Sequence, residues 1–157
     1  MRIVFMGTPD FAVPVLEGLI DGGYSIAGVY TKPDKGQGRG QELSISATKK
    51  VALANNLAIR QPPTLRSPVE MEAFRPLVPD LIVVAAYGLI LPLGVLSLPP
   101  YRCLNVHPSL LPKYRGSSPV SAAILAGEDK TGVTIMLMDE GTDTGPIVAQ
   151  REEKILR

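Results

Sequence analysis

His107 is the only histidine of the chain, and histidine is the side-chain type that titrates near neutral pH. It ends the run Cys103-Leu104-Asn105-Val106-His107, which is typical of a β-strand. Alternate strand residues point to the same side, so Asn105 and His107 are expected to project together. A hydrogen-bond donor and a proton-transfer group would then lie on the same face of the strand. The alternative is a ring satisfied by a backbone carbonyl, and the long polar loop that follows favours the catalytic interpretation.

An acidic turn, Asp139-Glu140-Gly141-Thr142-Asp143-Thr144-Gly145, is the second candidate for chemistry. Three carboxylates could hold a metal ion, but a single histidine and the lack of a second acidic cluster argue against it, and we predict no metal site. Asp143, held between two threonines, is the best placed to orient the imidazole and stabilise its charged form. A turn that is only solvated is the alternative.

Two loops carry apolar side chains outside any predicted strand. Leu110 and Leu111 follow the candidate histidine, and Tyr87-Gly88-Leu89-Ile90 follows the most apolar strand of the chain. Their partner is either the core or a flat ligand, and glycine at position 88 would allow close backbone approach.

Other enzyme classes fit these loops less well. The serines in Gly116-Ser117-Ser118-Pro119 do not form the GxSxG elbow of a hydrolase, and Gly7-Thr8-Pro9-Asp10 lacks the GxGxxG pattern of dinucleotide binding.

Basic charge is concentrated between residues 32 and 50. This segment contains five cationic and two acidic side chains, so its local net charge is +3 in a chain whose net charge is +1. Three glycines in the same segment, at positions 36, 38 and 40, would let it adapt to a phosphate backbone. A solvated flexible loop is the alternative.

Short β-branched runs alternate with helical patterns along the chain. The pattern predicts strands at 3–6, 25–31, 58–61, 81–86, 103–107, 133–138 and 147–151, and helices at 10–20, 46–56, 69–77 and 120–125, with Asp10 capping the first helix and a loop at 32–42. The run Leu81–Ala86 is apolar throughout, as expected for a sheet covered on both faces. We therefore predict an α/β protein with a Rossmann-like, mostly parallel sheet, helices on both faces and a final antiparallel strand pair.

Composition limits the remaining possibilities. The chain has 157 residues, 45% of them hydrophobic, which fits one domain with a proper core. Its single cysteine, Cys103, excludes a disulfide framework, and no apolar run is long enough to span a membrane. We expect a cytoplasmic protein with no membrane partner.

The segment Asn105-Val106-His107-Pro108-Ser109-Leu110-Leu111-Pro112 resembles the signature of the folate-dependent formyltransferases. The resemblance runs along the whole chain and implies the formyltransferase fold, with 10-formyltetrahydrofolate as the formyl donor. It implies catalytic roles for Asn105, His107 and Asp143, which agrees with the site built from residue chemistry. The residues that it implies for folate binding are Ser109, Leu110, Leu111, Pro112, Tyr87, Gly88, Leu89, Ile90, Asp139 and Gly141.

Other segments bear on the acceptor. The stretches 7–11, 86–92 and 131–136, together with Gly38-Arg39-Gly40, are similar to those of family members that formylate the methionyl group of charged initiator tRNA. The resemblance implies that Arg39 is the principal tRNA contact, supported by Lys35, Gly38 and Gly40. Formylation of a sugar-nucleotide or purine-precursor amine is the alternative acceptor chemistry. A non-catalytic RNA-binding module is the alternative from another class.

The resemblance also bears on domain organisation. Residues 1–157 are expected to form the catalytic domain, truncated at its C-terminal end before its last helix, and without the C-terminal β-barrel domain that contributes to tRNA binding in such members. We expect the full-length protein to be monomeric.

Overall fold

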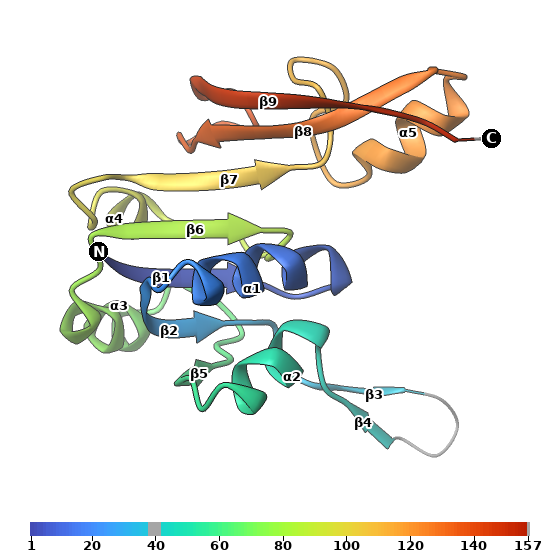
Figure 1. Cartoon of the computed structure of the whole chain (residues 1–157). Helices are drawn as coiled ribbons and strands as arrows, with labels where there is room; N and C mark the ends of the chain where they lie inside the picture. The colour runs from blue at the N-terminus through green and yellow to red at the C-terminus, as the bar shows by residue number, and fades with distance from the viewer. Residues whose placement is uncertain (38–41, 157) are drawn as a thin grey trace. The chain divides into compact units, whose positions relative to one another are not determined.

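The computed structural model describes residues 1–37 and 42–156, and its chain divides into two compact units, Met1–Arg102 and Cys103–Arg157. Each unit has its own set of strands (Figure 1). In the part of the chain described, no helix is long and apolar enough to cross a membrane.

Four parallel strands form the centre of the first unit. Strand β1 (Arg2–Gly7) lies between β2 (Ser25–Tyr30) and β6 (Leu81–Ala85), and the short β5 (Ile59–Arg60) pairs with β2. Nearly every residue of β1 and β6 is buried, so both faces of these strands are shielded from water. The α/β class with parallel strands, predicted from the continuous apolar runs, is confirmed.

Three helices of the first unit lie between these strands in the chain, α1 (Val13–Asp21), α2 (Ala47–Ala54) and α3 (Pro68–Phe74), and a fourth, α4 (Leu93–Leu96), follows β6. Two 3₁₀ turns lie at Asp10–Ala12 and Arg75–Leu77. Ser46 caps α2 by accepting a hydrogen bond from the backbone N–H of Lys49, and Ser67 caps α3 in the same way. The prediction that Asp10 caps the first helix is wrong. Asp10 begins the 3₁₀ turn, in which Ala12 N–H donates to the carbonyl of Pro9, and α1 begins after it.

A hairpin replaces the loop predicted at 32–42. Strand β3 (Lys35–Gln37) pairs antiparallel with β4 (Glu42–Ser44) in a separate two-stranded sheet. Three-residue strands are too short to show an alternating pattern, and glycine is depleted in strands, so the sequence pattern indicated a loop.

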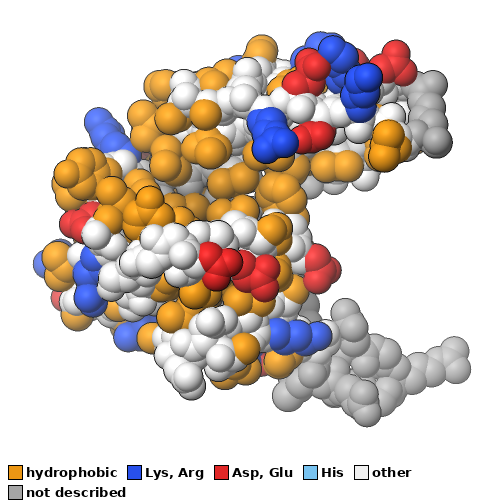
Figure 2. Space-filling view, in the orientation of Figure 1, with side chains coloured by type: hydrophobic (Ala, Val, Ile, Leu, Met, Phe, Trp, Pro, Cys, Tyr) orange, Lys and Arg blue, Asp and Glu red, His pale blue; other side chains and the backbone are white. Residues whose placement is uncertain are grey.

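The second unit is an antiparallel meander with one helix. Strands β7 (Cys103–His107), β8 (Lys130–Leu137) and β9 (Ile147–Lys154) pair in chain order, and α5 (Pro119–Leu125) connects the first two. The predicted antiparallel pairing of the last two strands is confirmed, with both strands longer than predicted. All eight residues of β9 are exposed. Figure 2 shows positive and negative side chains side by side over β8 and β9, consistent with the ion pairs Lys130–Glu152 and Arg151–Glu153.

Candidate active site

The carboxyl end of β7 carries the two side chains that were predicted to share one face of the strand. Asn105 lies opposite Met136 of β8, and His107 lies opposite Thr134, so both project from the same face of the antiparallel pair. His107 is 4% exposed, and Asn105 is half-buried. This face therefore combines a shielded imidazole with a more accessible amide.

Asp143 connects the acidic turn to Asn105 and His107. Its Oδ1 accepts a hydrogen bond from Asn105 Nδ2 at 3.2 Å, and its Oδ2 lies 3.5 Å from His107 Nδ1. The same Oδ2 accepts a hydrogen bond of 2.9 Å from the backbone N–H of Gly116. The three residues predicted as catalytic thus form one connected cluster within the second unit. Their chemical roles remain predictions.

The second ring nitrogen of His107 faces a backbone carbonyl. Nε2 lies 2.9 Å from the carbonyl oxygen of Tyr114, and because a carbonyl only accepts, Nε2 must carry the proton in this contact. Tyr114 and Asp143 both have positive φ, 58° and 51°, in the left-handed region that side chains rarely adopt. Such conformations persist where the surrounding structure over-determines them, often at functional sites.

The loop after His107 is held by polar contacts with β8 and β9. Thr134 Oγ1 donates to the carbonyl of Ser109 at 2.6 Å and accepts from the N–H of Leu111 at 3.1 Å. Gln150 Nε2 donates to the carbonyl of Leu111 at 2.8 Å. Sequence reasoning missed Thr134 and Gln150, because only the strand register brings them beside this loop.

The two leucines of that loop differ in their surroundings. Leu111 is 5% exposed and belongs to the buried core. Leu110 lies over Gly132 of β8, where an added Cβ would overlap its side chain. Ser109 is fully buried, and its hydroxyl donates to the carbonyl of Lys113 at 2.7 Å, inside the loop.

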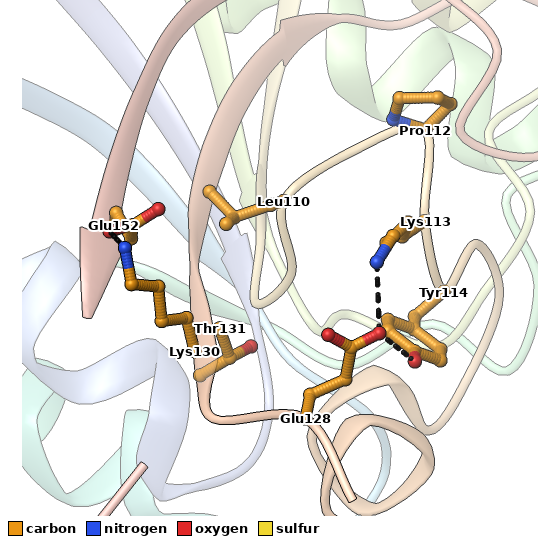
Figure 3. Close-up of a pocket in the computed structure, with 8 residues that line it drawn as sticks. All are labelled: Leu110, Pro112, Lys113, Tyr114, Glu128, Lys130, Thr131 and Glu152. Atoms are coloured by element: carbon orange, nitrogen blue, oxygen red, sulfur yellow. Dashed lines mark hydrogen bonds and ion pairs between the residues drawn. The ribbon is translucent and has the colours of Figure 1, made fainter. Parts of the chain in front are cut away.

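A pocket of about 380 Å³ opens beside this loop (Figure 3). Tyr114 Oη and Lys113 Nζ both donate to Glu128 Oε1, at 2.8 and 2.9 Å, and the hydrogen bond from Lys113 is the main cause that lowers the pKa of the Glu128 carboxyl. Thr131 Oγ1 is shielded from solvent and has no hydrogen-bond partner among the described residues. The lining residues are Leu110, Pro112, Lys113, Tyr114, Glu128, Lys130, Thr131 and Glu152.

Leu110 and Pro112 are the only lining residues that sequence reasoning assigned to ligand binding. Glu128, Lys130 and Glu152 carry no local motif and reach the pocket through the turn before β8 and the pairing of β8 with β9.

The acidic turn is partly self-supporting. Asp139 Oδ1 accepts hydrogen bonds from the N–H of Gly141 at 3.0 Å and from the hydroxyl of Thr144 at 2.8 Å. Asp139 and Gly141 are exposed. In the described part of the chain, no group of three or more histidine, cysteine or acidic side chains could hold a metal ion.

The other predicted folate-binding segment belongs to the first unit. The Tyr87 side chain is 1% exposed, and burial raises the pKa of its hydroxyl. Its carbonyl accepts a hydrogen bond from Thr8 Oγ1 at 3.0 Å. Gly88 has φ of 77°, and a Cβ there would overlap the Lys32 side chain. Leu89 is half-buried, whereas Ile90 is 70% exposed, so Ile90 presents most of its side chain to solvent.

Polar contacts anchor the segment just before the basic hairpin. Asp34 forms an ion pair with Lys49, and Gln61 donates to Asp34 Oδ1 at 2.8 Å and to the carbonyl of Lys32 at 2.9 Å. Lys49 Nζ also donates to Gln61 Oε1 at 2.7 Å. The predicted tRNA contact Lys35 begins β3, whereas Gly38, Arg39 and Gly40 lie outside the described residues.

Fold and sequence together define the class of this protein. A family model described as "Formyl transferase" matches residues 1–157, and the chain belongs to that family. A crystal structure of phosphoribosylglycinamide formyltransferase from Bacillus halodurans superimposes with a TM-score of 0.80 at 24% identity, covering 99% of this chain and 81% of that one. The predicted formyltransferase fold is thereby confirmed.

Curated relatives are more similar in sequence. A methionyl-tRNA formyltransferase of Alkaliphilus oremlandii is 53% identical over 155 residues, and one of Clostridioides difficile is 51% identical over 152 residues. These alignments cover 99% and 97% of this chain but 50% and 49% of the relatives. The chain thus spans about half the length of the curated relatives that it matches.

Proposed function

We propose that the whole protein transfers a formyl group from 10-formyltetrahydrofolate to the amino group of methionyl initiator tRNA. The observation that carries this proposal is the cluster in which Asp143 binds Asn105 and faces His107. Membership of the formyl transferase family and 53% identity to a methionyl-tRNA formyltransferase support the reaction and the acceptor.

In the proposed reaction the acceptor amine attacks the formyl carbon and a new C–N bond forms. The carbonyl oxygen becomes an oxyanion, and the tetrahedral intermediate then collapses as the bond to the folate nitrogen breaks. Asn105 uses one amide hydrogen on Asp143, which leaves its second N–H to donate to the oxyanion. One such donor typically contributes about 2.7–4 kcal/mol of transition-state stabilisation.

Protons must also move, because the attacking amine loses one and the departing folate nitrogen gains one. His107 Nε2 is engaged with the Tyr114 carbonyl, so we assign the exchange to Nδ1, which faces Asp143. The 3.5 Å separation from the carboxylate is longer than a normal hydrogen bond, as is common for catalytic contacts without substrate. The negative charge of Asp143 would stabilise the imidazolium that forms.

For the folate we propose contacts with two loops of the second unit. Leu110 and Pro112 line the pocket, and the exposed Asp139–Gly141 turn presents backbone groups. In the first unit we propose the half-buried Leu89 and the exposed Ile90 as further apolar contacts for folate. Ser109 and Leu111 act by holding the loop, since both are buried.

For the acceptor we propose that the basic segment around β3 and β4 contacts the tRNA phosphate backbone, with Arg39 as the principal contact and Lys35 as a second one. Anchoring by Asp34, Lys49 and Gln61 would fix the base of that segment. We further propose that the protein works in the cytoplasm and that it is a monomer.

An acceptor competition tests the proposal. The whole protein is given 10-formyltetrahydrofolate with methionyl initiator tRNA and, in parallel, with a phosphoribosylamine or a sugar-nucleotide amine. Formylation of the tRNA alone is the expected result. Transfer only to a small amine would assign the alternative acceptor, and salt-sensitive RNA binding without affinity for any folate analogue would indicate a non-catalytic module.

Variants connect that activity to the site. His107→Ala is expected to keep folate affinity and to lose formyl transfer, because it removes the proton-transfer group and no proposed folate contact. Turnover by this variant at the wild-type rate would reject the site.

A further inference from the structure

Three polar residues form one row across the second unit. His107 of β7 pairs in register with Thr134 of β8, and Thr134 pairs with Gln150 of β9. Residues directly opposite one another in a sheet project from the same face, so Gln150 lies on the same face as the imidazole, two strands away. Gln150 belongs to the exposed strand β9, yet its amide reaches towards the loop that follows His107.

The hydrogen bonds at the centre of this row use the full capacity of Thr134. Its hydroxyl donates to the carbonyl of Ser109 at 2.6 Å and accepts from the N–H of Leu111 at 3.1 Å and from Gln150 Nε2 at 2.9 Å. A hydroxyl has one donor and two acceptor sites, so all three are occupied. Thr134 is fully buried, so an unsatisfied site there would be costly.

Gln150 supplies the two donors that complete this arrangement. One Nε2 hydrogen goes to the Leu111 carbonyl at 2.8 Å, and the other goes to Thr134 Oγ1. Because a carbonyl can only accept, the orientation of the amide group is determined by the Leu111 contact. A carboxylate has no hydrogen to donate to either partner, and a thioether has none either.

The held segment ends at the residue that contacts the catalytic ring. Ser109 donates from its side chain to the Lys113 carbonyl at 2.7 Å, and the next carbonyl, that of Tyr114, accepts the Nε2 hydrogen of His107. The position of the Tyr114 carbonyl therefore depends on where the loop is tied to β8 and β9. That carbonyl in turn orients the ring so that Nδ1 faces Asp143.

We propose that Gln150 is a positioning residue for His107, acting through Leu111, Thr134 and the loop that ends at Tyr114. The inference rests on the proposed function for its effect on catalysis, while the effect on the ring itself can be measured without turnover. Gln150 is not a catalytic residue, because its contacts are with the protein loop.

Kinetics of the whole protein give the first test. Gln150→Met keeps the approximate size of the side chain and removes both hydrogen-bond donors. Gln150→Glu keeps the shape but places carboxylate oxygens, which only accept, against the Leu111 carbonyl and Thr134 Oγ1. Both are expected to lower kcat about tenfold or more, while KM for the folate changes less than about twofold, because a small misplacement of a reacting group is costly. Glu153→Gln, on the opposite face of β9, is the matched control and is expected to retain wild-type kcat.

Nuclear magnetic resonance gives the second test, and it is free of overlap because this chain has a single histidine. In ¹⁵N-labelled chain the Nε2 proton of His107 is expected to exchange slowly with water. In Gln150→Met it should exchange at least about fivefold faster as the loop opens locally. Thermal melting checks that each variant is folded. If Gln150→Met does not fold, the exchange measurement is made on Gln150→Glu instead.

The two measurements separate the possible failures. Unchanged Nε2 exchange in a folded Gln150 variant would overturn the positioning role, even if kcat falls. Faster exchange with reduced kcat supports it. Faster exchange in a protein that transfers no formyl group would support the positioning of His107 and reject only the proposed reaction.

Discussion

Asp143 holds the amide of Asn105 with one carboxylate oxygen and the backbone N–H of Gly116 with the other. The second oxygen also lies nearest the imidazole of His107. One carboxylate therefore contacts the proposed oxyanion donor, the proposed proton-transfer group and the end of the intervening loop.

Asp143→Asn is expected to lower kcat by about 100-fold or more, because the amide removes the charge that stabilises the imidazolium and offers one acceptor oxygen in place of two. Folate affinity should remain, since its main proposed contacts are elsewhere. Single-turnover formyl transfer and equilibrium folate binding measure the two quantities. Glu140→Gln, an exposed carboxylate in the same turn, is the control, and an equal loss of activity there would argue against a specific role for Asp143.

Asn105→Ala is expected to lower kcat about 10²- to 10³-fold through loss of the oxyanion donor. The loss should be similar for a good and a poor amine acceptor, because the oxyanion forms in both reactions. Rates measured with both acceptors test this. A change confined to KM would mean that Asn105 binds substrate without stabilising the transition state.

Gly116→Ala is expected to reduce both stability and turnover. Gly116 has φ of 93°, so alanine would be strained by about 1 kcal/mol or more, and the shifted N–H would release Asp143. Gly127 also has a left-handed φ, 72°, and, as at Gly116, an added Cβ there would meet no atom within 4 Å. Gly127→Ala should therefore cost similar stability in urea unfolding while leaving kcat near the wild-type value. Equal kcat in the two variants would contradict the link to Asp143.

The ion pair of Asp34 with Lys49 predicts an acid-sensitive contribution to stability. The hydrogen bond from Lys49, with a second from Gln61, lowers the pKa of the Asp34 carboxyl below its ordinary 3.8. A carboxyl whose pKa is lower in the folded state stabilises the fold above its unfolded pKa and loses that stabilisation as pH falls through the folded value. Unfolding free energies are measured between pH 2 and pH 6, a range that includes the unfolded aspartate pKa of about 4. The loss of stability on lowering the pH should be larger in wild type than in Lys49→Met. Parallel curves for the two proteins would refute it.

Local sequence pattern was sufficient where one element decides the outcome. The uninterrupted apolar run at Leu81–Ala85 requires cover on both faces, and the strand is buried as predicted. The two-residue spacing of Asn105 and His107 places both on one side of a strand wherever that strand pairs. The acidic turn was recognised in the same way, with Asp143 in its tightest part.

Contacts between distant residues could not be read from the sequence. Nothing in the pattern of β8 and β9 specifies that Thr134 pairs with His107 and Gln150, because an alternating strand reads the same in registers two residues apart. The Gly116 contact with Asp143 spans 27 residues and depends on two left-handed backbone conformations in non-glycine residues. The sequence by itself was enough to predict which side chains would transfer a proton and stabilise an oxyanion. Only the tertiary structure decided which backbone groups hold those side chains, since strand register and loop path are set by packing of the whole unit.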